Sequence, residues 1–236
     1  MTQPVNTILH ARWIIPVEES ANQDMQILPH HSLVINHGHI IAILPTDQVD
    51  PQYTAEEVVN LPDHALIPGM INTHTHAAMS LFRGLADDLP LMDWLNNHIW
   101  PAEQAWVNEE FVADGTRLAI AEMISSGTTC FNDMYFFPDV TAHVAAQSNM
   151  RATVGLIVID FPSSWASDQN DYFDKGLKVH DQYHREHPLI KTAFAPHAPY
   201  SVSDEPMKRV HMLAHELELP VHMHVHETQD EVNMSL

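Results

Sequence analysis

Two patterns of apolar and polar positions divide the chain near residue 64. Up to that point, short apolar runs alternate with polar positions and turn residues, which is typical of β-strands. Asn36-His37-Gly38 predicts a tight hairpin, because glycine adopts positive φ without steric cost. We expect strands over residues 6–17, 32–36, 39–44 and 57–61. Residues 1–64 are therefore predicted to form the N-terminal part of a small β-sandwich domain.

From residue 65 onward, apolar strands alternate with amphipathic helices. Strands in such an alternation pair in parallel through right-handed crossovers. The expected strands are residues 65–74, 128–135, 152–160, 189–195 and 219–226, and the expected helices are residues 108–126, 139–149, 171–186 and 205–218. We predict an α/β fold in which residues 65–236 form about five of the eight units of a (β/α)8 TIM barrel. Because the barrel is incomplete, we expect either a fragment of a longer protein or a chain that another chain completes, with residues 231–236 opening a further helix.

The connection after the first barrel strand, residues 77–103, is unusually long. Connections of this length are usually lids or binding loops. We call these residues the lid segment. Its apolar side chains are numerous enough to wall a pocket, and they include Leu81, Phe82, Leu89, Leu91, Trp94 and Trp100.

Histidines gather at the predicted carboxyl ends of two strands, where barrel enzymes build their active sites. His74 and His76 end what we expect to be a buried apolar strand, and side chains two apart on a strand share a face. His222, His224 and His226 are related in the same way. Zinc takes three or four nitrogen or oxygen ligands from separate elements, so the two groups together predict a metal site. The alternative is a set of hydrogen-bonded histidines in a polar barrel interior, and spacing alone does not select a ligand among the last three.

Other histidines are interpreted as non-ligands. His180, His184 and His187 fall on one helix face, but no paired acid or apolar surrounding supports a metal site, so we expect a solvated face. The histidines of the N-terminal strands and of the last predicted helix are expected at the surface or in ordinary packing. They are His30, His31, His37, His39, His211 and His215.

Composition narrows the class of protein. A hydrophobic content of 45% over 236 residues predicts a folded core, and a net charge of −21 argues against a nucleic-acid partner or an anionic membrane surface. No apolar run approaches the roughly 18 residues that span a bilayer. The single cysteine, Cys130, fits a reducing compartment, and the first residues lack the features of a signal peptide. We therefore expect a cytoplasmic protein.

Four stretches of sequence resemble the amidohydrolase superfamily. They are LIPGMINTHTHAAMSLFRGLADDLPLMDWLNNHIWPAE (66–103), CFNDMYF (130–136), APHAPYSVS (195–203) and HMHVHETQDEV (222–232). The resemblance is strongest to the branch that holds deaminases of 5-methylthioadenosine and S-adenosylhomocysteine together with triazine hydrolases and guanine deaminases. It implies a metal-dependent hydrolase that converts the 6-amino group of such a nucleoside into the inosyl product and ammonia.

The resemblance assigns a role to individual residues. It makes His74, His76 and His224 ligands of one divalent metal, with zinc expected, and leaves His222 and His226 as neighbours. In the implied reaction, hydroxide formed at the metal attacks C6 of the adenine ring. The resemblance also implies that Glu227 moves protons to and from the ring, and that His197 is a second catalytic residue that contacts the substrate. It further implies that Glu103 holds the ribose hydroxyls and that Arg151 contacts the tail of the substrate.

Part of the family pattern is absent. The resemblance implies a further histidine and a metal-binding aspartate on later strands, so we expect residues 1–236 alone to be inactive or nearly so. The expected partners are a small nucleoside and either a second copy of the chain or a completing C-terminal half. Two alternatives stay open: a triazine or guanine-type amidohydrolase, and a non-catalytic metal-binding half-barrel. The native metal is also open, because histidine and carboxylate sites accept zinc, iron or manganese.

Overall fold

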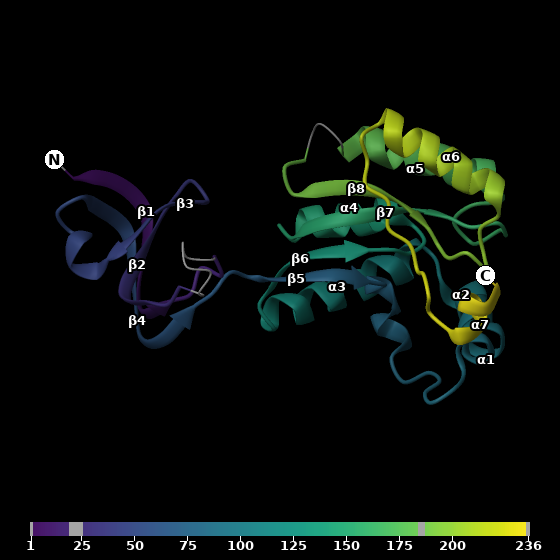
Figure 1. Ribbon diagram of the computed structural model, residues 1–236, viewed down its shortest axis with the longest axis horizontal. Helices are drawn as coiled ribbons and strands as arrows, with labels where there is room; N and C mark the ends of the chain where they lie inside the picture. The colour runs from purple at the N-terminus through teal and green to yellow at the C-terminus, as the bar shows by residue number, and fades with distance from the viewer. Residues whose placement is uncertain (1, 19–25, 184–186, 235–236) are drawn as a thin grey trace. The chain divides into compact units, whose positions relative to one another are not determined.

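The computed structural model describes residues 2–18, 26–183 and 187–234. The chain divides into two compact units, Met1–Gly69 and Met70–Leu236 (Figure 1). Each unit has its own sheet.

The first unit is a four-stranded sheet with the order β3-β2-β1-β4. Its strands are β1 (Gln3–Ile14), β2 (Leu28–Asn36), β3 (His39–Pro45) and β4 (Tyr53–Leu66), with a 3-10 turn at Thr46–Gln48. The predicted hairpin is confirmed, because Asn36 pairs with His39 and both His37 and Gly38 have positive φ. The buried apolar cluster of the unit is small and consists of Val5, Ile8, Val34 and Val49. The described part of this unit holds one sheet, so it shows no second sandwich layer.

The strand predicted over residues 65–74 is divided between the two units. Leu66 ends β4 opposite Ile14, and a new strand, β5 (Met70–Thr75), begins after Pro68 and Gly69. Proline has no N–H to donate to a strand ladder, which explains the break. The expectation of a buried strand is also wrong, because the exposed fractions of Met70 and Ile71 are 52% and 66%. Among the described residues, β5 is an edge strand that pairs with one neighbour only.

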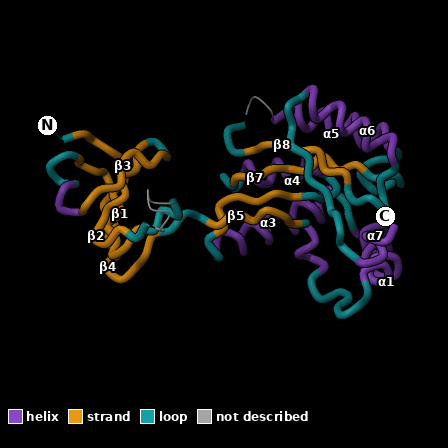
Figure 2. The backbone as a smooth tube through the Cα atoms, in the orientation of Figure 1, coloured by secondary structure: helices purple, strands orange, loops and turns teal. Residues whose placement is uncertain are grey.

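The second unit contains a parallel sheet in sequence order, β5-β6-β7-β8, which confirms the predicted α/β class. Figure 2 shows its strands side by side with helices beside them. The strands after β5 are β6 (Thr128–Asp133), β7 (Arg151–Val158) and β8 (Ile190–Pro196). The helices between and after them are α3 (Glu109–Ser125), α4 (Pro138–Gln147), α5 (Gln169–Tyr183) and α6 (Asp204–Glu216). A core that includes Phe131, Leu156, Phe173 and Phe194 fills the space between sheet and helices.

The predicted fifth strand, residues 219–226, does not form. Val221 makes one isolated bridge to Phe194, and the His222 N–H donates to the Phe194 carbonyl at 3.0 Å. A regular ladder would next need an N–H from Pro196, which proline lacks. Instead, the His224 N–H donates to the His197 carbonyl at 3.1 Å. The segment therefore follows β8 without becoming a strand of the sheet.

The lid segment folds into short helical turns. They are η2 (Ala77–Phe82), α1 (Leu91–Trp94), the π-helical η3 (Leu95–Ile99) and the start of α2 (Trp100–Trp106). A final helix, α7 (Gln229–Met234), occupies the place where a helix turn was expected, although residues 235–236 lie outside the described residues. In the described ranges, no helix combines the length and the apolar character needed to cross a bilayer.

His180 corrects the prediction of a solvated histidine face on α5. Its exposed fraction is 3%, and its Nδ1 lies 2.8 Å from the Thr192 hydroxyl. The helix packs this face against β8, so His180 is buried although the sequence pattern predicted an exposed position. His184 lies outside the described residues, and His187 is partly buried after the helix end.

Candidate active site

Three histidines from two distant segments converge at the carboxyl end of the parallel sheet. His74 lies in β5, His76 follows its end, and His224 lies in the segment beside β8. One nitrogen from each ring lies within 4.8 Å of the other two. The Nε2 atoms of His74 and His224 are 3.1 Å apart.

Hydrogen bonds to backbone carbonyls orient two of these rings. His76 Nδ1 donates to the Met134 carbonyl, and His224 Nδ1 donates to the His197 carbonyl at 2.8 Å. Because a carbonyl only accepts, each Nδ1 carries the proton and each Nε2 presents a lone pair. Metal-ligating histidines are typically held in this way.

The donor set fits a zinc ion. Two nitrogens bound to one tetrahedral zinc at about 2.0–2.1 Å lie about 3.3 Å apart, close to the His74–His224 separation. Burial, followed by the neighbouring imidazoles, lowers the pKa of His76 to about 4. Burial also lowers the pKa of His74. Both rings are therefore neutral near pH 7, the form that binds metal.

The other two histidines of the last segment differ in their surroundings. The His222 ring centroid lies 6.5 Å from that of His74, and its Nδ1 lies 3.3 Å from Asn132 Nδ2. Its buried Nε2 has no hydrogen-bond partner among the described residues. His226 is exposed, and its φ of 57° interrupts the alternation that was expected to give three histidines one common face.

Glu227 reaches the site from the turn before α7. One of its oxygens accepts a hydrogen bond from the Tyr200 hydroxyl at 3.0 Å. Its backbone N–H and that of His226 each donate to a carboxylate oxygen of the buried Glu231 at 2.8 Å. Glu231 therefore fixes the turn that presents Glu227. The Glu231 N–H donates to Thr228 Oγ1 at 3.2 Å, as in a capping box.

His197 is positioned directly after β8. Its N–H donates to the Val158 carbonyl at 3.0 Å, and its Nδ1 lies 2.7 Å from Ser201 Oγ. Burial, assisted by His224 and His76, lowers the pKa of His197 to about 3, so the ring is neutral at physiological pH.

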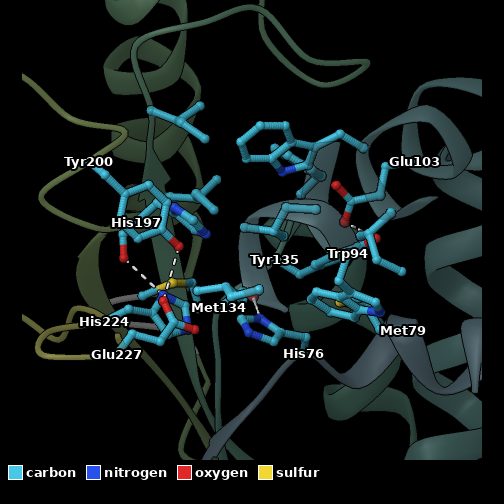
Figure 3. A pocket seen from close by; sticks show the side chains of 17 residues that line it. His76, Met79, Trp94, Glu103, Met134, Tyr135, His197, Tyr200, His224 and Glu227 are labelled. Carbon is cyan, nitrogen blue, oxygen red and sulfur yellow. Dashed lines mark hydrogen bonds between the residues drawn. The ribbon is translucent and has the colours of Figure 1, made fainter. Parts of the chain in front are cut away.

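A pocket lies between these groups and the lid segment. Figure 3 shows Glu103 on the wall opposite Glu227 and His224. Glu103 is partly buried and accepts a hydrogen bond from the Tyr135 hydroxyl at 2.8 Å. Burial raises the pKa of Glu103 to about 7, although this hydrogen bond opposes the rise. The apolar lining includes Met79, Leu91, Trp94, Leu95, Ile99 and Ile157.

Arg151 does not join the site. It is exposed at the amino end of β7, whereas the pocket lies at the carboxyl end. Seven further residues of extended strand separate the ends by roughly 20 Å, at about 3.3 Å per residue, which exceeds the reach of an arginine side chain. The assignment of Arg151 to the substrate tail is therefore corrected.

Several contributing residues were not assigned from sequence. Asp133 is 1% exposed, and its Oδ1 accepts the Ala77 N–H at 2.7 Å, which fixes the turn after His76. Burial raises the pKa of Asp133 to about 7. Tyr135 and Tyr200 orient the two pocket glutamates. The position of Asp133 at a strand end was an available signal, and so was the Thr228-to-Glu231 capping spacing.

A parallel sheet with three convergent imidazoles and two carboxylates at its carboxyl end has the arrangement of a metal-dependent hydrolase. Comparison with known sequences gives the particular family. The profile of the amidohydrolase family matches residues 65–236. The chain belongs to this family.

Individual relatives cover the whole chain. The 5-methylthioadenosine/S-adenosylhomocysteine deaminase of Saccharophagus degradans is 54% identical over 233 residues, which are 99% of this chain and 51% of that protein. An adenosine deaminase from Xanthomonas campestris, solved with bound zinc, is 49% identical with a TM-score of 0.95 and covers 100% of this chain and 52% of that one.

A more distant structure supports the fold alone. Guanine deaminase from C. acetobutylicum, solved with bound guanine, is 22% identical with a TM-score of 0.83 over 95% of this chain and 54% of that one. The chain thus spans about half the length of the relatives it matches.

Proposed function

We propose that this chain carries the metal-binding and nucleoside-binding part of a hydrolytic deaminase. The proposed reaction converts the 6-amino group of 5-methylthioadenosine or S-adenosylhomocysteine to the inosyl product and ammonia. The observation that carries this proposal is the convergence of three histidine nitrogens within 4.8 Å, two of which, those of His76 and His224, belong to residues that line a pocket with Glu227 and Glu103. The 54% identity to a deaminase named for these two substrates supports the choice.

The proposed metal ligands are His74, His76 and His224. Zinc is the proposed ion, because the nitrogen spacing suits it and the relative from Xanthomonas campestris was solved with zinc. A bound divalent metal lowers the pKa of water from about 15.7 to about 7 and so supplies hydroxide at neutral pH.

The protein's own groups would bind the nucleoside and move its protons. Tyr200 holds one oxygen of Glu227, which leaves the other free to pass a proton to the ring nitrogen and to the departing ammonia. Glu103 would accept hydrogen bonds from the vicinal ribose hydroxyls, a pairing selective for a ribose. His197 would contact the purine, because its ring lines the same pocket.

The relation between chain length and activity forms part of the proposal. Residues 1–236 alone are expected to be inactive or nearly so. We assign turnover to a complete-barrel protein, in which these residues are joined to the remaining strands and helices of the barrel in the same chain or in a second chain. We also propose a cytoplasmic location, in keeping with the single unpaired cysteine.

Ammonia release from a panel of compounds tests the function. The complete-barrel protein should release ammonia from 5-methylthioadenosine or S-adenosylhomocysteine in preference to guanine and a chlorotriazine. Turnover of the last two alone would reject the nucleoside assignment. A monomer that holds no metal and turns over none of the compounds would favour a non-catalytic half-barrel.

A further inference from the structure

A second pocket, of about 580 Å³, adjoins the one that His76, His197 and His224 line. Trp100, Glu103 and Phe136 line both, so Glu103 lies on the boundary between them. The remaining lining comes from α2, its preceding turn and the loop after β7, and consists of Asn96, Pro101, Gln104, Phe161, Pro162, Ser163 and Ser164. A role for the second pocket in substrate binding rests on the proposed function of the first.

The chemistry of a nucleoside relates the two pockets. On a ribose, the base at C1′ and the 5′ carbon at C4′ leave from opposite sides of the edge that carries the 2′ and 3′ hydroxyls. A carboxylate that holds both hydroxyls therefore has the base on one side and the 5′ substituent on the other. With the base beside the histidines, the 5′ substituent enters the second pocket.

The lining of the second pocket is aromatic and uncharged except at Glu103. The rings of Trp100 and Phe161 pack edge to face with centroids 5.6 Å apart. Its other polar groups are amides and hydroxyls, and the part of the chain that the structure describes contributes no lysine or arginine to this lining. Lys175, in the following helix α5, is engaged elsewhere, since its Nζ donates to the Trp165 carbonyl and lies 3.0 Å from a carboxylate oxygen of Asp171.

We propose that the second pocket is the site of the 5′ substituent and selects uncharged thioethers, exemplified by methylthio, over the zwitterionic homocysteine group. A thioether sulfur makes favourable contacts with aromatic rings. The α-carboxylate of homocysteine would enter a site without a cationic partner and with a glutamate at its mouth, and burying an unpaired charge is unfavourable. The pocket thus discriminates between the two substrates for which the relative is named.

The test compares kcat/KM for 5-methylthioadenosine, adenosine and S-adenosylhomocysteine in the zinc-loaded complete-barrel protein. We expect 5-methylthioadenosine to exceed S-adenosylhomocysteine by at least tenfold. Phe161→Ala should lower the value for 5-methylthioadenosine by roughly tenfold and the value for adenosine by a clearly smaller factor, because adenosine lacks the methylthio group that contacts the ring.

A variant that adds a positive charge tests whether the missing cationic partner disfavours S-adenosylhomocysteine. Gln104 is exposed on α2 at the second pocket, so Gln104→Arg should fold normally and raise kcat/KM for S-adenosylhomocysteine at least fivefold. The matched control is Gln182→Arg, which adds the same charge to an exposed position of α5 and should change neither substrate.

The outcomes separate this inference from the proposed function. Equal kcat/KM for the two thioethers, or no gain for S-adenosylhomocysteine in Gln104→Arg, would overturn the selectivity and leave the deaminase assignment standing. Absence of turnover with all three adenosine nucleosides would overturn both.

Discussion

His74 and His224 place their Nε2 atoms 3.1 Å apart, although 150 positions separate them in the chain. With His224 Nδ1 donating to the His197 carbonyl, the Nε2 of His224 is an acceptor aimed at a second imidazole. A cation satisfies both rings at once. The cluster is therefore the feature on which the proposed activity depends most directly.

Removal of a ligand should remove the metal. We expect one zinc ion per chain in the unmodified protein, and His224→Ala or His74→Ala should weaken zinc binding at least tenfold, because each removes one of three protein donors. Elemental analysis after dialysis against a weak chelator measures this. The matched control is His211→Ala, an exposed histidine of α6, which should keep its zinc. Full zinc content in both ligand variants would remove the basis for the site.

Glu227 and its tyrosine should affect catalysis to different extents. Glu227→Gln is expected to lower kcat by roughly 10²–10⁴-fold, since it removes the group proposed to move protons. Tyr200→Phe removes only the hydrogen bond that orients this carboxylate, so a loss nearer tenfold in kcat with little change in KM is expected. Steady-state kinetics distinguish the two, with Tyr53→Phe in the N-terminal unit as control. An unchanged kcat in Glu227→Gln would assign proton transfer to another group.

Glu231 should matter for stability as well as for the placement of Glu227. Glu231→Ala removes two hydrogen bonds from the His226 and Glu227 N–H groups to a buried carboxylate, at a cost of about 1–3 kcal/mol in the free energy of unfolding. Urea denaturation measures the change. Glu216→Ala, at an exposed position of α6, should change stability by less than about 0.5 kcal/mol. Equal effects of the two substitutions would contradict a fixing role for Glu231.

The raised pKa of Glu103 should make stability depend on pH. Its folded-state pKa, about 7, exceeds its ordinary value of 4.5, because the surrounding protein desolvates the carboxylate. The folded chain therefore holds a proton that the unfolded chain releases, and this stabilising contribution is complete below pH 4.5 and is lost as pH rises to about 7. Relative to Glu103→Gln, the unmodified protein should lose about 1–2 kcal/mol across this window, a figure reduced for the partial exposure of the side chain. A pH-independent difference between the two proteins would show that burial does not perturb this group.

The same variant tests the ribose contact. Glu103→Gln should weaken 5-methylthioadenosine binding by roughly tenfold above pH 7, since a neutral amide replaces a charge-assisted acceptor. Isothermal titration calorimetry measures the affinity. A 2′-deoxy analogue, which lacks one of the two hydroxyls, should show a smaller difference between variant and unmodified protein.

Gly115 should be intolerant of a side chain, because α3 lies directly against η2. A Cβ at Gly115 would overlap the carbonyl oxygen of Ala78, which lies two residues after His76. Gly115→Ala should therefore lower the free energy of unfolding by about 1–3 kcal/mol, and it should also weaken zinc binding. The matched control is Gly176→Ala in α5, whose Cβ would meet Leu156 at an ordinary 3.4 Å and which gains helix propensity.

Much of this arrangement follows from local sequence. The hairpin at Gly38 and the strand–helix alternation of the second unit were predictable, because turn chemistry and apolar periodicity depend on neighbouring residues. The convergence of the histidines required the family resemblance, since no local pattern selects His224 over His222. His180 and the exposed face of β5 were predicted wrongly, because burial depends on which other elements cover a residue. Pro196 was considered only as part of the family motif at residues 195–203. Its missing N–H explains why the last segment does not become a strand.

The lid segment begins directly after His76 and closes with Glu103. In the proposed function, His76 holds the metal ion and Glu103 holds the ribose. The two ends of the lid segment are therefore bound to different ligands. Because both ends of the lid segment lie at groups of the site, a change in the fold of this segment would displace the proposed metal ligand and the proposed ribose contact together.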